Sequence, residues 1–261
     1  MTKNELCSTG VKELDIQMSG GIPVGSTVLL TGSSGSGKTT LSMQYLFHGA
    51  RNGERGVFFT ITEPLFKLTK NLEGFRFYDK KLIESGMVNI IDLRIISERL
   101  GLDTEKYTVE DAGALLDILK DIADELDAKR LVMDSITALC YRLQTREMIR
   151  DFIFKLGTSL AIMNCTTILT SEVPPNTYKF SQYEIEEFIS DGIIFLGDEQ
   201  RKGDLIRTLQ VIKMRGIEHS RTKFSLHISA QRGIELIPLL KSSDFESQLI
   251  EKVQLASKVV G

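Results

Sequence analysis

The feature that most constrains this chain is the segment GSSGSGKT at residues 32–39. It matches G-x-x-x-x-G-K-[ST] at every fixed position, the pattern of a loop that binds phosphate groups. The apolar run Thr27–Thr31 before it predicts a buried strand, and a helical pattern follows from about Thr39 to Ala50. A chance match in a flexible Gly/Ser linker would lack this strand and this helix. The segment therefore predicts a strand–loop–helix unit, which is typical of folds built on a parallel sheet.

Each residue type in this loop has a reason in phosphate chemistry. Glycines let the backbone turn so that successive N–H groups point at phosphate oxygens, and the start of the helix adds its positive dipole end. Lys38 brings a cation to the outer phosphates, and the Thr39 hydroxyl offers an oxygen to Mg²⁺. We therefore expect a bound nucleotide to contact Gly32, Ser33, Ser34, Gly35, Ser36, Gly37, Lys38, Thr39 and Thr40.

A second part of a nucleotide site is an acidic residue at the end of another buried strand. The segment Arg130–Asp134 reads RLVMD, so Asp134 follows four residues of strand. The carboxyl ends of parallel strands meet at one edge of a sheet, which would bring Asp134 to the phosphate loop. We expect Asp134 to hold Mg²⁺ together with Thr39, directly or through water. The alternative is an aspartate that only caps the next turn.

Two glutamates lie at the ends of other predicted strands. Glu63 follows the strand Gly56–Ile61 and precedes Pro64, where a carboxylate could orient or deprotonate the water that attacks the γ-phosphate. The alternative for Glu63 is a surface residue that begins the next helix, with Pro64 near its first position. Glu172 follows the strand Thr166–Thr170 and is a candidate sensor of the γ-phosphate, or a residue with a structural role only.

The alternation of strands and amphipathic helices predicts the fold class. Another buried strand is expected at Val88–Asp92, and apolar residues at helical spacing mark helices across Ala112–Leu126 and Met148–Leu160. This order predicts an α/β fold with a mostly parallel central sheet flanked by helices. Beyond about residue 190, strands are expected at Gly192–Leu196, Ile206–Met214 and Lys223–Ile228. With a turn over Asp198–Asp204, these strands would form an antiparallel C-terminal extension of the same sheet.

The organisation of the chain follows from the same patterns. No linker rich in proline, glycine or serine divides it, so we expect one domain over residues 1–240. Residues 241–261 follow as a tail, in which Phe245, Leu249, Val253 and Ala256 keep helical spacing. We expect the tail to pack as a helix on its own domain or to contact a partner or another subunit.

Composition narrows the class of function. The 261 residues include 32 Lys+Arg and 35 Asp+Glu, a formal charge of −3, and no basic run, which argues against strong nonspecific binding of nucleic acid. The polar start and the short apolar runs predict neither a signal peptide nor a membrane-spanning helix. Cys7, Cys140 and Cys165 form no CxxC pair, so we expect free thiols in a reducing compartment, the cytoplasm.

Together with the phosphate loop, several motifs resemble those of the KaiC-like ATPases, within the RecA/RadA branch of P-loop NTPases. The similarity runs from about Ser8 to Pro238. It rests on STGVKELD (8–15), GGIPVGS (20–26), DS (134–135), EEFISDG (186–192) and KMRGIEH (213–219). The last two segments separate this family from other P-loop branches. The resemblance implies a RecA-like core, ATP with Mg²⁺, and ring-shaped homo-hexamers with nucleotide at the subunit interfaces.

In such rings the late motif reaches the phosphates of the neighbouring subunit, and the matching residues here are Lys213, Arg215 and His219. Their spacing along a strand end would project them on one side. An arginine supplied by a partner stabilises the charge that develops on the γ-phosphate, so Arg215 is expected to act in trans. Without the resemblance, the three residues would be ordinary charges on a solvated strand end.

One position departs from the family pattern. KaiC-like members usually carry two adjacent glutamates after the second strand, and Thr62 and Glu63 occupy those places here. A threonine hydroxyl cannot accept a proton at neutral pH as a carboxylate can. The leading expectation is therefore a slow ATPase that uses Lys38 and Glu63.

Other functions remain open at this stage. One is an ATP-dependent assembly switch with little turnover, like the related FlaH, which has a similar Thr-Glu arrangement and would act with a regulatory protein partner. A recombinase-like DNA-binding protein is a weaker alternative, because the chain lacks a basic stripe. Autokinase activity is also weaker, because the duplicated second domain of the clock protein is missing.

Overall fold

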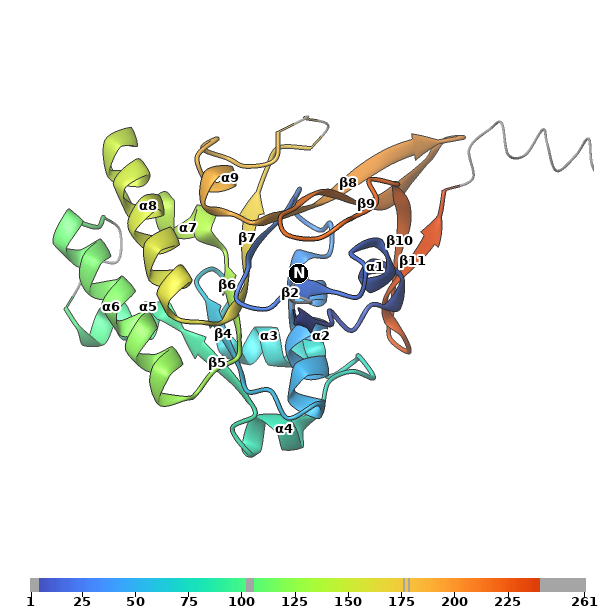
Figure 1. Cartoon of the computed structure of the whole chain (residues 1–261). Coiled ribbons are helices and arrows are strands. Elements are labelled where there is room, and N and C mark those ends of the chain that lie inside the picture. The colour runs from blue at the N-terminus through green and yellow to red at the C-terminus, as the bar shows by residue number, and fades with distance from the viewer. Residues whose placement is uncertain (1–4, 102–105, 176, 178, 240–261) are drawn as a thin grey trace, which may run out of the picture.

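A nine-stranded sheet runs through the centre of the computed structural model, which describes residues 5–101, 106–175, 177 and 179–239 (Figure 1). Its strands are β3 (Thr27–Gly32), β4 (Gly56–Thr60), β5 (Val88–Asp92), β6 (Arg130–Asp134), β7 (Thr166–Glu172), β8 (Gly192–Arg201), β9 (Asp204–Met214), β10 (Phe224–Ser229) and β11 (Gly233–Pro238). Their order across the sheet is β11-β10-β9-β8-β3-β7-β6-β4-β5. The expected domain end at residue 240 and the tail over 241–261 lie outside the described residues.

The parallel half of the sheet comprises β8, β3, β7, β6, β4 and β5. All residues of β3 and β4 are buried, which explains their continuous apolar runs, since helices cover both faces of these strands. The register pairs Gly32 with Glu172 and Thr60 with Asp134. The carboxyl ends of four strands therefore meet at one edge, as the α/β fold prediction requires.

The antiparallel half comprises β9, β10 and β11, which extend the sheet from β8 as expected. The turn expected over Asp198–Asp204 is wrong, however, because β8 continues to Arg201 and β9 begins at Asp204. Lys202 and Gly203, both with positive φ, make a two-residue hairpin turn. The polar residues before the turn lie in a ribbon that is exposed towards its tip, so they lack the apolar alternation that reveals a strand.

Each face of the sheet has its own core. The first core is formed by α1 (Lys12–Gln17), α2 (Lys38–Arg51), α3 (Leu65–Leu72) and α4 (Lys80–Glu84). The second is formed by α5 (Leu93–Arg99), α6 (Val109–Glu125), α7 (Ile136–Cys140), α8 (Arg146–Ile162) and α9 (Glu186–Ile189). Val28 and Leu30 point into the first core and Leu29 into the second, as alternation along a strand requires. Among the described residues, no helix has the length and apolar character needed to cross a membrane.

Two short strands, β1 (Leu6–Cys7) and β2 (Ile22–Pro23), pair beside the first core.

A buried arginine fixes α2 against the sheet. Arg130, the first residue of β6, is 1% exposed, donates to the carbonyl oxygens of Ser8 and Tyr45 at 2.8 Å, and pairs with Glu54 at 2.5 Å. Gly49 on α2 leaves room for this guanidinium, because a Cβ there would clash with it. The position of α2 in turn determines where the phosphate loop lies.

Candidate nucleotide-binding site

The phosphate loop joins the end of β3 to the start of α2, as its sequence predicts. Gly37 caps α2 with φ 108°, a left-handed conformation that favours glycine, and a Cβ there would also meet Ile228 of β10. Gly37, as a glycine, has no side chain that could cap the first turn of α2. The N–H groups of this turn therefore face the loop, which is the arrangement that binds anions at a helix start. Ser34 and Gly35 form the exposed tip of the loop, and Thr40 is half-buried on α2.

Lys38 lies across the inside of this loop. Its side chain is largely buried, with the residue 6% exposed, and Nζ donates to the carbonyl oxygens of Gly32 at 2.8 Å and Ser33 at 2.9 Å. Burial lowers the pKa of Lys38, while the carboxylates of Glu172 and Asp134 act in the opposite direction. A phosphate chain beside this ammonium would restore its preference for the charged form. Ser36 Oγ is also buried and has no hydrogen-bond partner in the described part of the chain, so the loop holds a polar group that suits a phosphate oxygen.

Thr39 and Asp134, the two predicted magnesium ligands, lie side by side in the structure. Thr39 Oγ1 donates to Asp134 Oδ2 at 2.7 Å, and Thr170 Oγ1 donates to Asp134 Oδ1 at 2.6 Å. A hydroxyl and a carboxylate side by side supply the hard oxygen donors that Mg²⁺ takes, usually together with substrate phosphates and water. These residues therefore fit the ion. Within the described ranges, no group of three or more His, Cys, Asp and Glu side chains offers another metal site.

Glu63 lies at the same edge, beyond the end of β4. The strand ends at Thr60, one residue earlier than expected, where the Thr60 hydroxyl donates to the Glu63 carbonyl at 2.7 Å. The backbone N–H of Ile61 donates to the Asp134 carbonyl oxygen at 3.0 Å, which links the chain after β4 to the end of β6, where the candidate magnesium ligand Asp134 lies. The carboxylate of half-buried Glu63 accepts a hydrogen bond from Asn71 Nδ2 at 2.9 Å. A side chain on α3 therefore holds the candidate base in one orientation.

Glu172, the candidate sensor, ends β7 next to the phosphate loop. It is opposite Gly32 in the β3–β7 register, and its backbone N–H donates to Thr137 Oγ1 at 2.9 Å. Its carboxylate is exposed and acts electrostatically on Lys38. The structure therefore brings the loop, Asp134, Glu63 and Glu172 to one edge of the sheet.

The residues of the late motif lie elsewhere and differ in what they contact. Lys213 Nζ donates to the carbonyl oxygens of Glu187 at 3.2 Å and Ser190 at 2.6 Å, near the end of α9. Burial, followed by the charge of Arg215, lowers the pKa of Lys213. Arg215 is 58% exposed in its side chain and approaches Asp191 at 3.5 Å. His219 does not line the hollow that Lys213 and Arg215 share, because its neighbours in sequence contact the end of α1.

Arg215 is at the edge of the sheet opposite the phosphate loop. Its backbone N–H donates to Asp191 O at 2.9 Å, and the N–H of Asp191 donates to Thr27 O at 2.7 Å. Thr27 begins β3 and Gly32 ends it, so five residue-to-residue steps along the strand, roughly 16 Å, separate the two positions. Within one chain, Arg215 therefore lies too far away to serve the loop.

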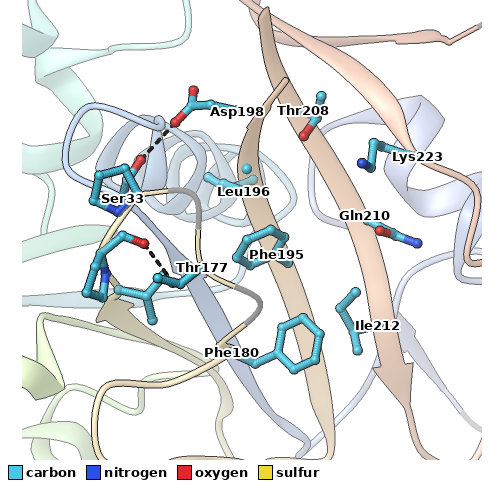
Figure 2. A pocket seen from close by; sticks show the side chains of 14 residues that line it. Ser33, Thr177, Phe180, Phe195, Leu196, Asp198, Thr208, Gln210, Ile212 and Lys223 are labelled. Atoms are coloured by element: carbon cyan, nitrogen blue, oxygen red, sulfur yellow. Dashed lines mark hydrogen bonds between the residues drawn. The ribbon is translucent and has the colours of Figure 1, made fainter. Parts of the chain in front are cut away.

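Two contacts to the loop come from residues that sequence reasoning missed. Ser33 Oγ donates to Asp198 Oδ2 at 3.0 Å, as Figure 2 shows, and Arg207 Nε donates to the Gly35 carbonyl at 3.0 Å. Beside them is a cavity of about 270 Å³. Its walls include Phe180 and Phe195, whose rings pack edge to face with their centroids 5.6 Å apart. Local sequence carries no signal for these contacts, because the stretch from Asp198 resembles a turn.

The fold and the site together define the class of protein. A parallel sheet with a phosphate loop after β3 and an aspartate at the end of β6 is the arrangement of a P-loop NTPase with a RecA-like core. A model of the family described as the KaiC ATPase matches residues 7–241. The chain belongs to the KaiC family of ATPases, which confirms the resemblance seen in the motifs.

Known proteins similar to this chain support the same assignment. It is 34% identical over 237 residues to a UPF0273 protein of Methanopyrus kandleri, covering 90% of this chain and 92% of that protein. It is 31% identical to the circadian clock protein KaiC3 of Synechocystis, covering 90% of this chain but only 46% of that protein. The crystal structure of a KaiC-like protein from Pyrococcus horikoshii matches with a TM-score of 0.79 and 34% identity, over 90% of this chain and 100% of that chain. The RecA-like fold is thereby confirmed.

Proposed function

We propose that this chain binds ATP and hydrolyses it slowly, with Mg²⁺ held by Thr39 and Asp134. The observation that carries the proposal is the 2.7 Å hydrogen bond between these two side chains at the mouth of the phosphate loop. The loop N–H groups and Lys38 would bind the phosphate oxygens, which offsets their negative charge. When bound, Mg²⁺ would supply further positive charge to the terminal phosphates.

Glu63 is the proposed base or water-positioning group in hydrolysis. Its carboxylate would orient the attacking water and accept a proton from it, and Asn71 would keep the carboxylate in place. Thr62, which is exposed beside it, has no carboxylate to share this task. We therefore propose that turnover is slow compared with family members that carry two glutamates here.

The proposal includes a homo-oligomeric ring in which Arg215 acts on the nucleotide of the neighbouring chain. Its place at the opposite edge from the loop supports a role in trans, because a head-to-tail arrangement can bring one edge of a chain to the other edge of the next. Phe188, 69% exposed, lines the same hollow as Arg215 and offers apolar surface for such a contact. We propose a cytoplasmic location, because the three cysteines are free thiols.

A second candidate function is an ATP-dependent assembly switch with little turnover, acting on a regulatory protein partner. Thr62 favours it, because the switch needs nucleotide binding but no efficient base. Titration calorimetry with ATP–Mg²⁺, a phosphate-release assay and mass measurement in solution distinguish the two functions. Tight binding with slow release supports the ATPase, and tight binding with assembly but no release supports the switch. Equal ATP affinity in the wild type and Lys38→Ala would overturn both.

A further inference from the structure

The projecting hairpin β8–β9 touches the phosphate loop at its base. Asp198 and Arg207 are directly opposite each other in the antiparallel pairing, so their side chains stand on the same face of the ribbon. From this face the Asp198 carboxylate accepts a hydrogen bond from Ser33 Oγ, and Arg207 Nε donates to the Gly35 carbonyl. One cross-strand pair therefore holds the residues on either side of Ser34, the exposed tip of the loop.

The direction of the Gly35 carbonyl has a consequence for the loop interior. In a planar trans peptide the C=O and the following N–H point to opposite sides. With the carbonyl turned out towards Arg207, the N–H of Ser36 points into the loop, where it donates to Ser33 O at 3.3 Å. Lys38 Nζ donates to the same oxygen at 2.9 Å. The external contact thus favours the peptide orientation that a phosphate-binding loop needs.

We propose that Asp198 and Arg207 are positioning residues, which hold the phosphate loop in the conformation that receives the nucleotide. The inference rests on the proposed function, since it assumes that this loop binds ATP. It goes beyond that function because it assigns a role to Asp198 and Arg207, which lie outside all of the nucleotide motifs. The two residues act through their hydrogen bonds to Ser33 and Gly35, which hold the loop in one conformation before the nucleotide binds.

The size of the effect follows from the contacts. Each hydrogen bond has one charged partner, and such bonds are stronger than those between neutral groups. Arg207 is exposed, which weakens its bond, so we expect roughly a tenfold change in a binding constant. Without these contacts the loop must become ordered when the nucleotide binds, and the free-energy cost of that ordering weakens nucleotide binding.

The first test is hydrogen exchange of the peptide spanning residues 30–42 in the nucleotide-free protein. We expect Asp198→Ala and Arg207→Ala each to speed exchange of the loop amides by several-fold, with little change elsewhere in the sheet. Arg207→Lys, which keeps a cationic donor, should restore part of the protection. The matched control is Arg201→Ala, which removes an exposed arginine of the same ribbon whose ion pair is with Glu199.

The second test is titration calorimetry with ATP–Mg²⁺ on the same variants. The dissociation constant should rise about tenfold in Asp198→Ala and in Arg207→Ala, and remain unchanged in Arg201→Ala. Ser33→Ala removes the other partner of Asp198. The Ser33→Ala/Asp198→Ala double variant should therefore bind no more weakly than the worse single variant, because both changes remove the same hydrogen bond.

The outcomes separate this inference from the proposed function. Loop exchange and ATP affinity that stay at wild-type values in Asp198→Ala and Arg207→Ala would overturn the positioning role. An equal change in Arg201→Ala would also overturn it, because the effect would then belong to the ribbon as a whole. If the substitutions change the exchange of the loop amides as expected but the wild-type protein binds no ATP, the proposed function would be overturned instead.

Discussion

Thr39 and Asp134 are 95 positions apart in sequence, yet the Thr39 hydroxyl donates to Asp134 Oδ2 at 2.7 Å. The second carboxylate oxygen accepts from Thr170 at 2.6 Å, so both oxygens are oriented. Strand order explains the meeting, because β7 alone separates β3, which leads into Thr39, from β6, which ends at Asp134. The pair is thus placed by regular elements, with Thr39 on α2 and Asp134 at the end of β6.

The first prediction concerns magnesium. Asp134→Asn keeps an oxygen that can accept from Thr39 but removes the negative charge that would hold the ion. We expect Mg²⁺ to lose most of its effect on ATP affinity, with binding in Mg²⁺ at least about tenfold weaker than in the wild type. Calorimetry with Mg²⁺ and with a chelator measures this. Thr170→Val, which removes only the supporting hydroxyl, should keep most of the Mg²⁺ effect, and an undiminished Mg²⁺ effect in Asp134→Asn would contradict the site.

The second prediction concerns the base. Glu63→Gln should leave ATP binding nearly intact and cut phosphate release by roughly 10²-fold or more, the usual scale for a general base. Asn71→Ala removes the amide that holds the Glu63 carboxylate and should cause a smaller loss of the same rate. Phosphate release from a single-turnover mixture measures both. Equal rates in the wild type and Glu63→Gln would exclude Glu63 as the base.

The third prediction concerns the boundary between chains. Arg215→Ala should still bind ATP as a single chain but lose ATP-dependent assembly, or lose turnover by about 10³-fold, because the arginine would serve the neighbouring site. Mixing it with Lys38→Ala should restore part of the activity, since each variant is defective in a different half of the site. Lys129→Ala is the matched control, as Lys129 precedes β6 on the same edge and is ion-paired with Asp127. Co-assembled mixtures without any recovery would count against a role in trans.

The fourth prediction separates two glycines on helices. Gly49→Ala would push a Cβ into the guanidinium of buried Arg130, so we expect the free energy of unfolding to fall by about 1–3 kcal/mol. For Gly113→Ala on α6, the described residues place no atom within 4 Å of the new Cβ apart from the backbone of the helix itself, so the change should stabilise the protein by about 0.5–1 kcal/mol. Denaturant unfolding measures both values. A neutral Gly49→Ala would show that Arg130 moves aside at no cost.

The fifth prediction concerns the thiols. Burial raises the pKa of Cys165 to about 11 and raises the pKa values of Cys7 and Cys140 as well. The thiolate is the reactive form, so at pH 8 the native protein should not react with a thiol reagent. The unfolded chain, with thiol pKa values near 8.5, should react at all three positions. Because the folded state holds these protons more tightly, the free energy of unfolding should fall as pH rises from about 8.5 towards 11.

Much of this site was accessible from sequence because its signals are local. The loop at Gly32–Thr39 and the strand before it lie within a short segment, and the spacing of its glycines follows from backbone geometry alone. Asp134 was found in the same way, as an acid that ends an apolar run. The parallel order of strands then required both to share one edge. The motifs carried the family assignment as well, since residues 7–241 match the family model.

Long-range register and packing decided the rest. Asp198 and Arg207 meet the loop only because they face each other in a hairpin whose polar sequence resembles a turn. Arg215 lies at the edge opposite Lys38 because β9 runs antiparallel to β8, a direction that residue types near 213–219 do not encode. His219 is separated from Arg215 by the path of the chain towards α1. Short-range patterns thus determined which elements form and which carry phosphate chemistry. The tertiary structure decided which side chains meet, because pairing between distant strands depends on the packing of the whole sheet.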